Sequence, residues 1–547
     1  MEHVYRPGSQ SGHRYEWLAV PVFLVFLTLF WCFPSRDYTA VDGAVRCIGV
    51  FKDKNLLFHG NNHLLYPFWI GRWAALAGAM GIKAANAFQF MRISQAMNGL
   101  LGAAAIAILY GILQLLVEYQ IALLCTALFG LSTAVLLHAT NSAEPVSGLF
   151  FALLAMRVLI EGLRRNSRSI LVASGICLAL ALASYQGMGI VAGVCAFACF
   201  WWVENRDGKS LFGIPVSLLW ITVGGLAGVC GIYGSAYFHE GIPIAQMPHQ
   251  FLSLGGAPEV YSGFTVSRFV NVPFGLLRNW FGAVPAGYSG IRALLHNPQR
   301  AFWLPAALAG LLVIGGIAWL VSKALWRLTH DWSHGCKVVS LAAAAMLVFP
   351  LLYWDSGYDK LWLLPLGAMM AAIAVSFRPK LLLPKERWTL LSMLVIALGA
   401  EIAVNAPRTV HSHFAPTPYL SDAESVSQSL GPSDRIVLGF DSVSSLWLTF
   451  WGQGVNWSQD SNWLLLPAST PSDAKQWLAA ADVEHRQNNN SRILFLGILD
   501  QDRQHWDDFL GKRVGIPFSS FDEYRAHAIV LHRYALGSDS MTLRAFQ

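Results

Sequence analysis

Long apolar runs alternate with short polar connections between residues 17 and 404. A helix needs about 20 apolar residues to cross the hydrocarbon core of a bilayer, and eleven runs come near this length. We therefore predict eleven membrane-spanning helices. Their residue ranges are 17–33, 88–117, 120–138, 143–160, 169–184, 187–203, 211–237, 301–321, 338–354, 360–376 and 388–404.

Two connections are long enough to carry structure of their own. Residues 34–87 contain a further apolar stretch, 63–81, whose Trp and Arg residues suit a helix at the depth of the lipid headgroups. Residues 239–300 are rich in Gly, Pro and aromatic side chains, and they include a candidate amphipathic helix at 266–281. Both connections are predicted to lie on the same side of the membrane.

The pattern changes after about residue 405, where the chain becomes polar. Three short apolar runs, at 435–440, 492–499 and 527–534, have the length of strands, and helix-like stretches separate them. This alternation is typical of a small α/β domain. The predicted fold is thus a polytopic α-helical membrane domain at 1–404 followed by an α/β domain at 405–547.

Composition identifies the class of protein. Hydrophobic residues make up 55% of the chain and charged residues 13%, whereas soluble domains carry about 25% charged residues. We therefore predict an integral membrane protein in contact with membrane lipids. The net charge of +6 is small, and the cationic residues are concentrated in short loops. This charge informs the topology and does not indicate a nucleic-acid partner.

The loop cations predict the orientation. One set of short connections is basic, and the opposite set, at 138–144, 184–187 and 353–360, contains only Lys360. Because cytoplasmic loops carry the excess of Lys and Arg, the N-terminus is predicted inside and the C-terminal domain outside. The absence of cysteine after Cys336 favours the cytoplasmic membrane of a bacterium. The basic connections contain Arg164, Arg165, Arg168, Arg206, Lys209, Lys323, Arg327, Lys337, Arg378, Lys380, Lys385 and Arg387.

In this topology, most of the unusual polar residues share the outer side of the membrane. Ionisable residues at membrane borders are costly to keep and usually mark function. We therefore expect an active site or a substrate vestibule there. The residues concerned are Asp37, Asp42, His63, His138, Asn141, Glu144, Tyr185, Gln186, Asp355, Asp359 and Lys360.

The most informative string is RDYTAVDGAVR at 36–46, directly after the first span. A carboxylate at this place can act as a general base if a partly buried cleft positions it. Considered alone, Asp37 and Asp42 fit ordinary solvated loop carboxylates better than catalytic ones. The neighbouring motifs favour the catalytic interpretation.

These motifs resemble those of polytopic glycosyltransferases of the GT-C fold, which include the bacterial aminoarabinose transferases of lipid A and the protein O-mannosyltransferases. The similar strings are DGAV at 42–45, NHLLYP at 62–67, the span at 92–113, HATNSAEP at 138–145 and YWDSGYDKLW at 353–362. One departure is that Gly43 follows Asp42, where the family often has Asp-Glu.

The resemblance implies transfer of a sugar from a polyprenyl-phosphate donor to a hydroxyl of a lipid, glycan or protein acceptor, with inversion at the anomeric carbon. Asp42 would be the general base, with Asp37 as the second choice. Lys360 would be the first partner of the donor phosphate, and the other candidates are Arg46, Arg72, Arg268 and Arg278. The candidate substrate-binding residues are His63, His138, Asn141, Glu144, Tyr185, Gln186, Asp355 and Asp359.

Other interpretations remain open at this stage. Each of these cations could instead bind lipid headgroups, and Glu144 could be a carboxylate that favours the start of a helix. His63, His138 and Glu144 could hold a divalent ion, although their spacing matches no metal signature, and no metal site is assigned. A transporter or flippase is the alternative function, but the chain shows no repeated halves. A non-catalytic scaffold would not explain the clustered carboxylates.

Overall fold

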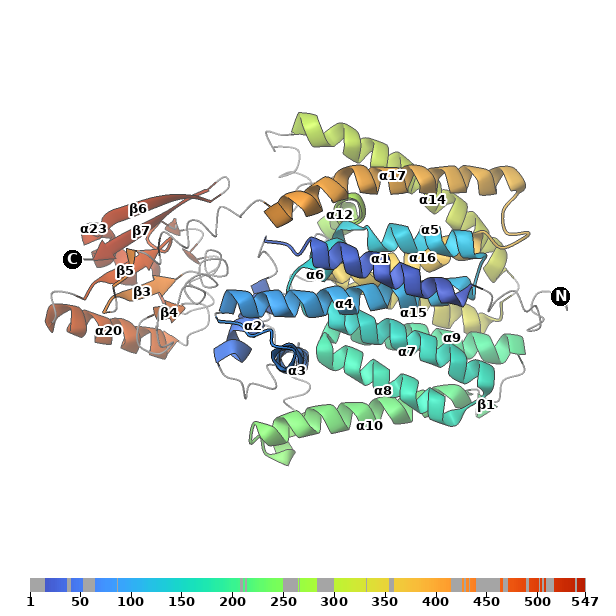
Figure 1. Cartoon of the computed structure of the whole chain (residues 1–547), viewed down its shortest axis with the longest axis horizontal. Coiled ribbons are helices and arrows are strands. Elements are labelled where there is room, and N and C mark those ends of the chain that lie inside the picture. The colour runs from blue at the N-terminus through green and yellow to red at the C-terminus, as the bar shows by residue number, and fades with distance from the viewer. Residues whose placement is uncertain are drawn as a thin grey trace. The chain divides into compact units, whose positions relative to one another are not determined.

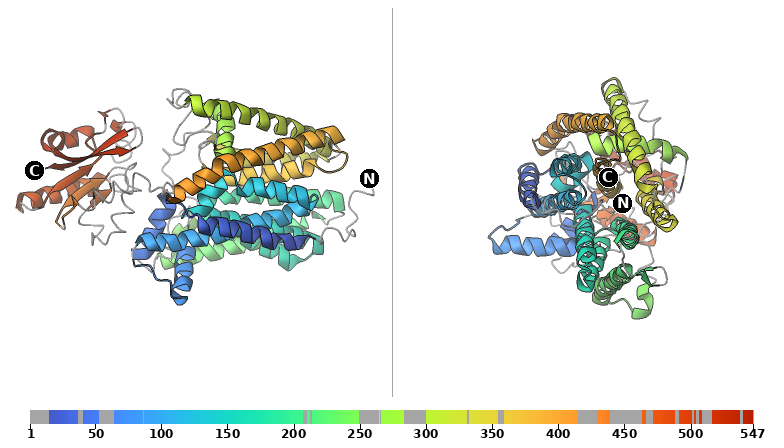
Figure 2. Two further views of the ribbon diagram at one scale, coloured as in Figure 1. Left: turned by 45° about the horizontal axis from the view of Figure 1, so that its top comes forward. Right: turned by 90° about the vertical axis from the view of Figure 1, so that its right-hand side faces the viewer.

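The computed structural model describes most of the chain (Figures 1 and 2). The described residues are 15–36, 41–52, 64–85, 87–206, 210–211, 214–248, 264, 266–282, 300–330, 332–353, 359–414, 426, 429–431, 433–438, 463–465, 471–487, 491–500, 502–503, 506–507, 516–536 and 539–546. They fall into two compact units. The helical unit comprises Met1–Ser35, Lys54–Ala75 and Ser94–His411, and the second unit comprises Arg36–Asp53, Leu76–Ile93 and Ser412–Gln547.

The elements of the helical unit are long helices joined by short turns. Helices α3 and α4 begin in one unit and end in the other. The elements are η1 (Glu16–Leu18), α1 (Ala19–Cys32), α3 (Tyr66–Ala79), α4 (Ala87–Gln114), α5 (Tyr119–Gly130), α6 (Thr133–Thr140), α7 (Pro145–Arg165), α8 (Arg168–Ser184), η3 (Gln186–Ile190), α9 (Val191–Arg206), β1 (Ser210–Leu211), β2 (Ile214–Pro215), α10 (Val216–His239), η4 (Ile244–Gln246), α12 (Val266–Phe281), α14 (Arg300–Thr329), α15 (His334–Tyr353), η6 (Asp359–Trp362), α16 (Leu363–Ser376) and α17 (Pro384–Phe414).

Eight helices among the described residues are long and apolar enough to cross a membrane. The pair α5 and α6 also passes this test when taken together, and Glu16–Cys32 and Arg168–Ser184 are shorter apolar helices. Each of the eleven predicted runs therefore coincides with a helix or with the α5–α6 pair. The chain is an integral membrane protein with a mostly helical fold.

The run predicted as one span at 120–138 is bent by 63° between α5 and α6. Gly130 ends α5 against Phe26, where an added Cβ would lie 2.3 Å from the phenyl ring. A helix break exposes backbone carbonyls that need partners. Here the Ser132 hydroxyl donates to the Phe129 carbonyl at 2.7 Å, and the Asn405 amide donates to the Leu131 carbonyl at 2.8 Å.

Close backbone contact brings α7, α8 and α10 side by side (Figure 1). An added Cβ at Gly224 of α10 would lie 2.1 Å from the Val172 carbonyl oxygen, and one at Gly175 of α8 would lie 2.1 Å from that of Ile221. Small residues at helix interfaces allow this approach in membranes. In contrast, α3 and α12 run across the direction of the long helices (Figures 1 and 2).

The second unit contains a five-stranded mixed sheet in the order β4-β3-β5-β7-β6. Strand β3 pairs in parallel with β4 and β5, whereas β7 is antiparallel to β5 and β6. The apolar core joins the sheet to α20 and includes Val437, Leu478, Phe495 and Trp506. The elements are α2 (Val41–Lys52), β3 (Arg435–Leu438), β4 (Trp463–Leu465), α20 (Pro471–Gln487), β5 (Ile493–Leu496), η9 (Phe518–Phe521), α23 (Asp522–His527), β6 (Ile529–Leu536) and β7 (Asp539–Phe546).

The three predicted strand-like runs coincide with β3, β5 and β6. Strand β7 was not predicted, because its sequence DSMTLRAF is too polar to give a continuous apolar signal. It is stabilised by pairing on both sides, with β5 and with β6. Tertiary pairing thus overrides its local composition.

Candidate functional site

A buried polar network positions the turn between α6 and α7. The Asn98 amide on α4 donates to the backbone carbonyls of Asn141 and Ala143, each at 2.8 Å. The hydroxyls of Ser94 and Ser142 lie 2.9 Å apart, and Tyr66 of α3 lies within 3.4 Å of both. Buried polar groups need such partners. The network therefore holds α3, α4 and the turn in one arrangement.

Two predicted site residues belong to this turn, and both are buried. The Asn141 amide donates to the Leu137 carbonyl at 3.0 Å, so it satisfies the last turn of α6. Glu144 occupies the N-cap position of α7 before Pro145, and its backbone carbonyl accepts a hydrogen bond from Ser147. Both residues thus contribute to the geometry of the α6–α7 connection.

His138, at the end of α6, faces Asp359, the first residue of η6. Their Nε2 and Oδ1 atoms are 3.4 Å apart, and the His138 side chain is 6% exposed. The backbone N–H of Lys360 donates to the same Asp359 oxygen at 2.8 Å. A carboxylate with these two neighbours has a fixed position. The structure therefore brings together two predicted residues that are far apart in the sequence.

Cationic side chains come from elements near this pair, since α12 contacts both α6 and η6. Arg278 on α12 is close enough to attract the Asp359 carboxylate. Arg408 on α17 is close enough to Arg278 for the two guanidinium groups to repel each other. Lys360 follows Asp359 in η6. We call Arg278, Lys360 and Arg408 the cation cluster. Several cations on neighbouring elements favour an anionic ligand.

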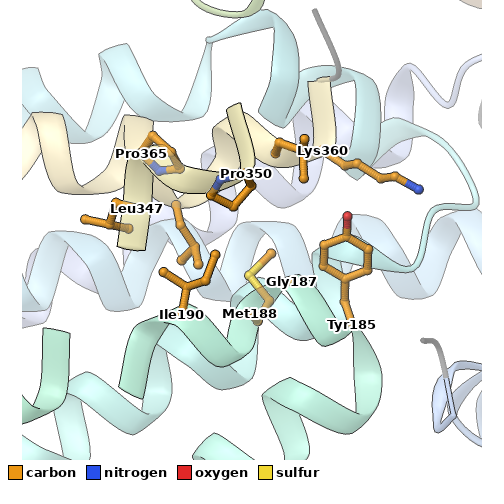
Figure 3. A pocket seen from close by; sticks show the side chains of 10 residues that line it. Tyr185, Gly187, Met188, Ile190, Leu347, Pro350, Lys360 and Pro365 are labelled. Atoms are coloured by element: carbon orange, nitrogen blue, oxygen red, sulfur yellow. The ribbon is translucent and has the colours of Figure 1, made fainter. Parts of the chain in front are cut away.

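A small pocket, partly open to its surroundings, begins beside Lys360. Its wall is apolar and comes from η3, α15 and the start of α16, with Ile190, Leu347 and Pro365 at one end (Figure 3). Lys360 and Tyr185 lie at the other end, where the lysine Nζ is 5.7 Å from the centre of the tyrosine ring. This distance is within the range of a cation–π interaction. The pocket thus joins a cationic end to an apolar wall.

Comparison with known proteins gives a match in structure only. No family model matches the sequence, and no curated protein matches it. The crystal structure of ArnT from Cupriavidus metallidurans bound to undecaprenyl phosphate superimposes with a TM-score of 0.55 at 10% identity, over 97% of this chain and 98% of that chain. The archaeal oligosaccharyltransferase AglB from Archaeoglobus fulgidus, in complex with an inhibitory peptide and a dolichol-phosphate, gives 0.51 at 11% identity, over 98% and 76%. The chain has the GT-C fold.

The remaining predicted residues lie in several different elements. Gln186 begins η3 beside Tyr185, and Arg268 lies in the first turn of α12. Arg72 is exposed on α3, and its guanidinium carbon is 5.1 Å from the Phe68 ring centre. Asp42 and Arg46 lie on α2 of the second unit, and the Asp42 side chain is outside the described residues. Asp37, His63 and Asp355 also lie outside them.

A metal site at His63, His138 and Glu144 was only an alternative, and it stays untested because His63 lies outside the described residues. Within the described ranges, no group of three or more His, Cys, Asp or Glu side chains could hold a metal ion.

Sequence reasoning missed Arg408 and the polar face of α4. Arg408 follows the last apolar window, so it was assigned to the C-terminal domain, whereas α17 continues to Phe414. Ser94 and Asn98 lie in a long apolar run, where they were counted as membrane-spanning residues. Their spacing of four residues places them on one helix face, and this spacing is a signal that could have revealed the network.

Proposed function

We propose that this protein is a membrane glycosyltransferase that moves a sugar from a polyprenyl-phosphate donor to a hydroxyl acceptor, with inversion at the anomeric carbon. The observation that carries the proposal is an apolar pocket with the cationic side chain of Lys360 at one end. A polyprenyl phosphate has the matching chemistry, since a charged head is joined to a hydrocarbon tail. The ArnT and AglB structures contain undecaprenyl phosphate and dolichol-phosphate, respectively, which supports a ligand of this class.

In this mechanism, the donor phosphate binds at the cation cluster, and the polyprenyl tail follows the apolar wall. Negative charge grows on the phosphate as the bond to the anomeric carbon breaks, so nearby cations stabilise the transition state more than the ground state. His138 holds the Asp359 carboxylate in place. The negative charge of this carboxylate limits the net positive charge of the cation cluster. Asp42 removes the proton from the acceptor hydroxyl as it attacks, with Asp37 as the alternative base.

The proposal includes a topology. The eleven apolar runs cross the membrane with the N-terminus inside, and the domain at 405–547 lies outside with the active site, in the cytoplasmic membrane of a bacterium. Cysteine labelling in intact cells tests this arrangement. Ser472→Cys should react with a membrane-impermeant reagent and Lys385→Cys should not, because basic loops stay in the cytoplasm. The opposite labelling would overturn the topology.

The enzymatic part is tested with purified protein in lipid nanodiscs. The protein is incubated with a panel of polyprenyl-phosphate sugars and with lipid, glycan and peptide acceptors. Transfer should release free polyprenyl phosphate and give a glycosylated product. Movement of an unchanged lipid-linked substrate across a liposome membrane, without transfer to any acceptor, would favour the alternative function, a transporter or flippase.

A further inference from the structure

The side chain of Asn405 connects three segments that are far apart in the sequence. Its amide nitrogen donates to the Leu131 carbonyl at 2.8 Å and to the Trp280 carbonyl at 3.3 Å. Its amide oxygen accepts a hydrogen bond from the Thr133 hydroxyl at 2.9 Å. Asn405 is 3% exposed. One buried side chain on α17 thus links the α5–α6 break, the first turn of α6 and the end of α12.

The backbone at the end of α12 allows this close contact with Asn405. Gly282, directly after α12, has a φ of +62°, which favours glycine. An added Cβ there would lie 2.4 Å from an Arg408 guanidinium nitrogen and 2.7 Å from the Asn405 amide oxygen. Glu401, one turn before Asn405, is fully buried on the same helix. The last residues of α12 are therefore held against α17.

The linked segments carry the site. His138 lies five residues after Thr133 on α6, and Arg278 lies two residues before Trp280 on α12. The distance between these two segments decides whether His138 and Arg278 can act on Asp359 together. We propose that Asn405 is a positioning residue, which sets α6 and α12 so that His138 and Arg278 share Asp359 and the donor phosphate site stays assembled. This inference rests on the proposed function.

Asn405→Asp tests the role with little change in volume. The second carboxylate oxygen would replace the amide nitrogen and would repel the carbonyl oxygens of Leu131 and Trp280, while Thr133 could still donate. We expect the affinity for undecaprenyl phosphate to fall about tenfold, the scale of a lost buried hydrogen bond to a group left unpaired. Binding is measured by titration of the purified protein. The matched control is Ser174→Ala, which removes a buried side-chain hydrogen bond between α8 and α7 at the Ala155 carbonyl and should leave the affinity unchanged.

A double-mutant cycle separates positioning from general destabilisation. If Asn405 acts through Arg278, Asn405→Asp should add little to the loss caused by Arg278→Ala, because the two changes affect one interaction. Independent, additive losses would overturn the proposal, and so would wild-type affinity in folded Asn405→Asp. If gel filtration shows that Asn405→Asp does not fold, the affinity of Thr133→Val for undecaprenyl phosphate is measured instead. This change removes one contact, so it should weaken binding about threefold, and unchanged affinity would refute the role.

The same titration distinguishes this inference from the proposed function. A wild-type protein that does not bind undecaprenyl phosphate would contradict the donor class itself. Wild-type binding together with unchanged binding by the Asn405 and Thr133 variants would contradict only the positioning role.

Discussion

The sheet of the second unit and the site of the helical unit use ionic groups in different ways. In the sheet unit, Arg492 forms hydrogen bonds to both oxygens of Asp434, Arg435 pairs with Glu484, and Arg544 pairs with Asp500 at 2.7 Å. Each of these cations has its own carboxylate. In the helical unit, Asp359 faces the His138 ring at 3.4 Å, and Arg278 and Arg408 lie on the neighbouring α12 and α17.

This difference separates charges that stabilise the fold from charges that are available for a ligand. The hydrogen bonds from Arg492 satisfy both Asp434 oxygens within the sheet unit, and they raise the pKa of the Arg492 guanidinium. The cation cluster contains three like charges, and a bound phosphate would offset their net charge. The first arrangement predicts effects on stability, and the second predicts effects on turnover and donor binding.

The largest expected effect concerns the general base. Asp42→Asn removes the proposed general base and should lower turnover about 100-fold or more, the usual scale for loss of a general base. Donor binding and the melting temperature should stay near wild type. Turnover is measured as release of polyprenyl phosphate. If Asp37→Asn abolishes turnover while Asp42→Asn does not, the base is Asp37.

A smaller loss is expected at Lys360. Lys360→Ala should lower both donor affinity and turnover, each about tenfold, because a cation next to the phosphate matters more as the leaving group gains charge. Lys360→Arg should restore part of the loss, since it keeps the charge but changes the geometry. Donor titrations give both constants. The matched control is Lys337→Ala, near the start of α15. This variant should behave as wild type.

Unchanged kinetics of Lys360→Ala would mean that this lysine only anchors the start of its helix at the membrane border. The phosphate site would then move to Arg268 and Arg278.

The smallest effect on activity is expected in the sheet unit. Asp434→Asn leaves Arg492 without its carboxylate and should lower the free energy of unfolding by about 2 kcal/mol, less than for a fully buried pair, because the Arg492 side chain is 35% exposed. Thermal denaturation measures the loss. Turnover per folded molecule should not change. A fall in turnover without a fall in melting temperature would contradict the division between the two kinds of charge.

Much of the helical architecture could be predicted because its signals are local. Each apolar run coincides with a helix or with the α5–α6 pair, and the amphipathic run at 266–281 is α12. The bend between α5 and α6 could not be predicted in this way. The residues around it stay apolar, and the bend depends on Phe26 against Gly130 and on Asn405 against the Leu131 carbonyl.

The sequence by itself determined that the chain enters a membrane, where its apolar runs lie and which residues are unusual for such a protein. These properties depend on the transfer of single side chains and short segments from water to lipid. Only the tertiary structure decided that His138 faces Asp359, that Arg408 lies against the end of α12, and that Asn98 and Asn405 satisfy backbone groups of distant turns. The physical reason is that contacts between distant segments follow from helix packing, which no local pattern of residues specifies.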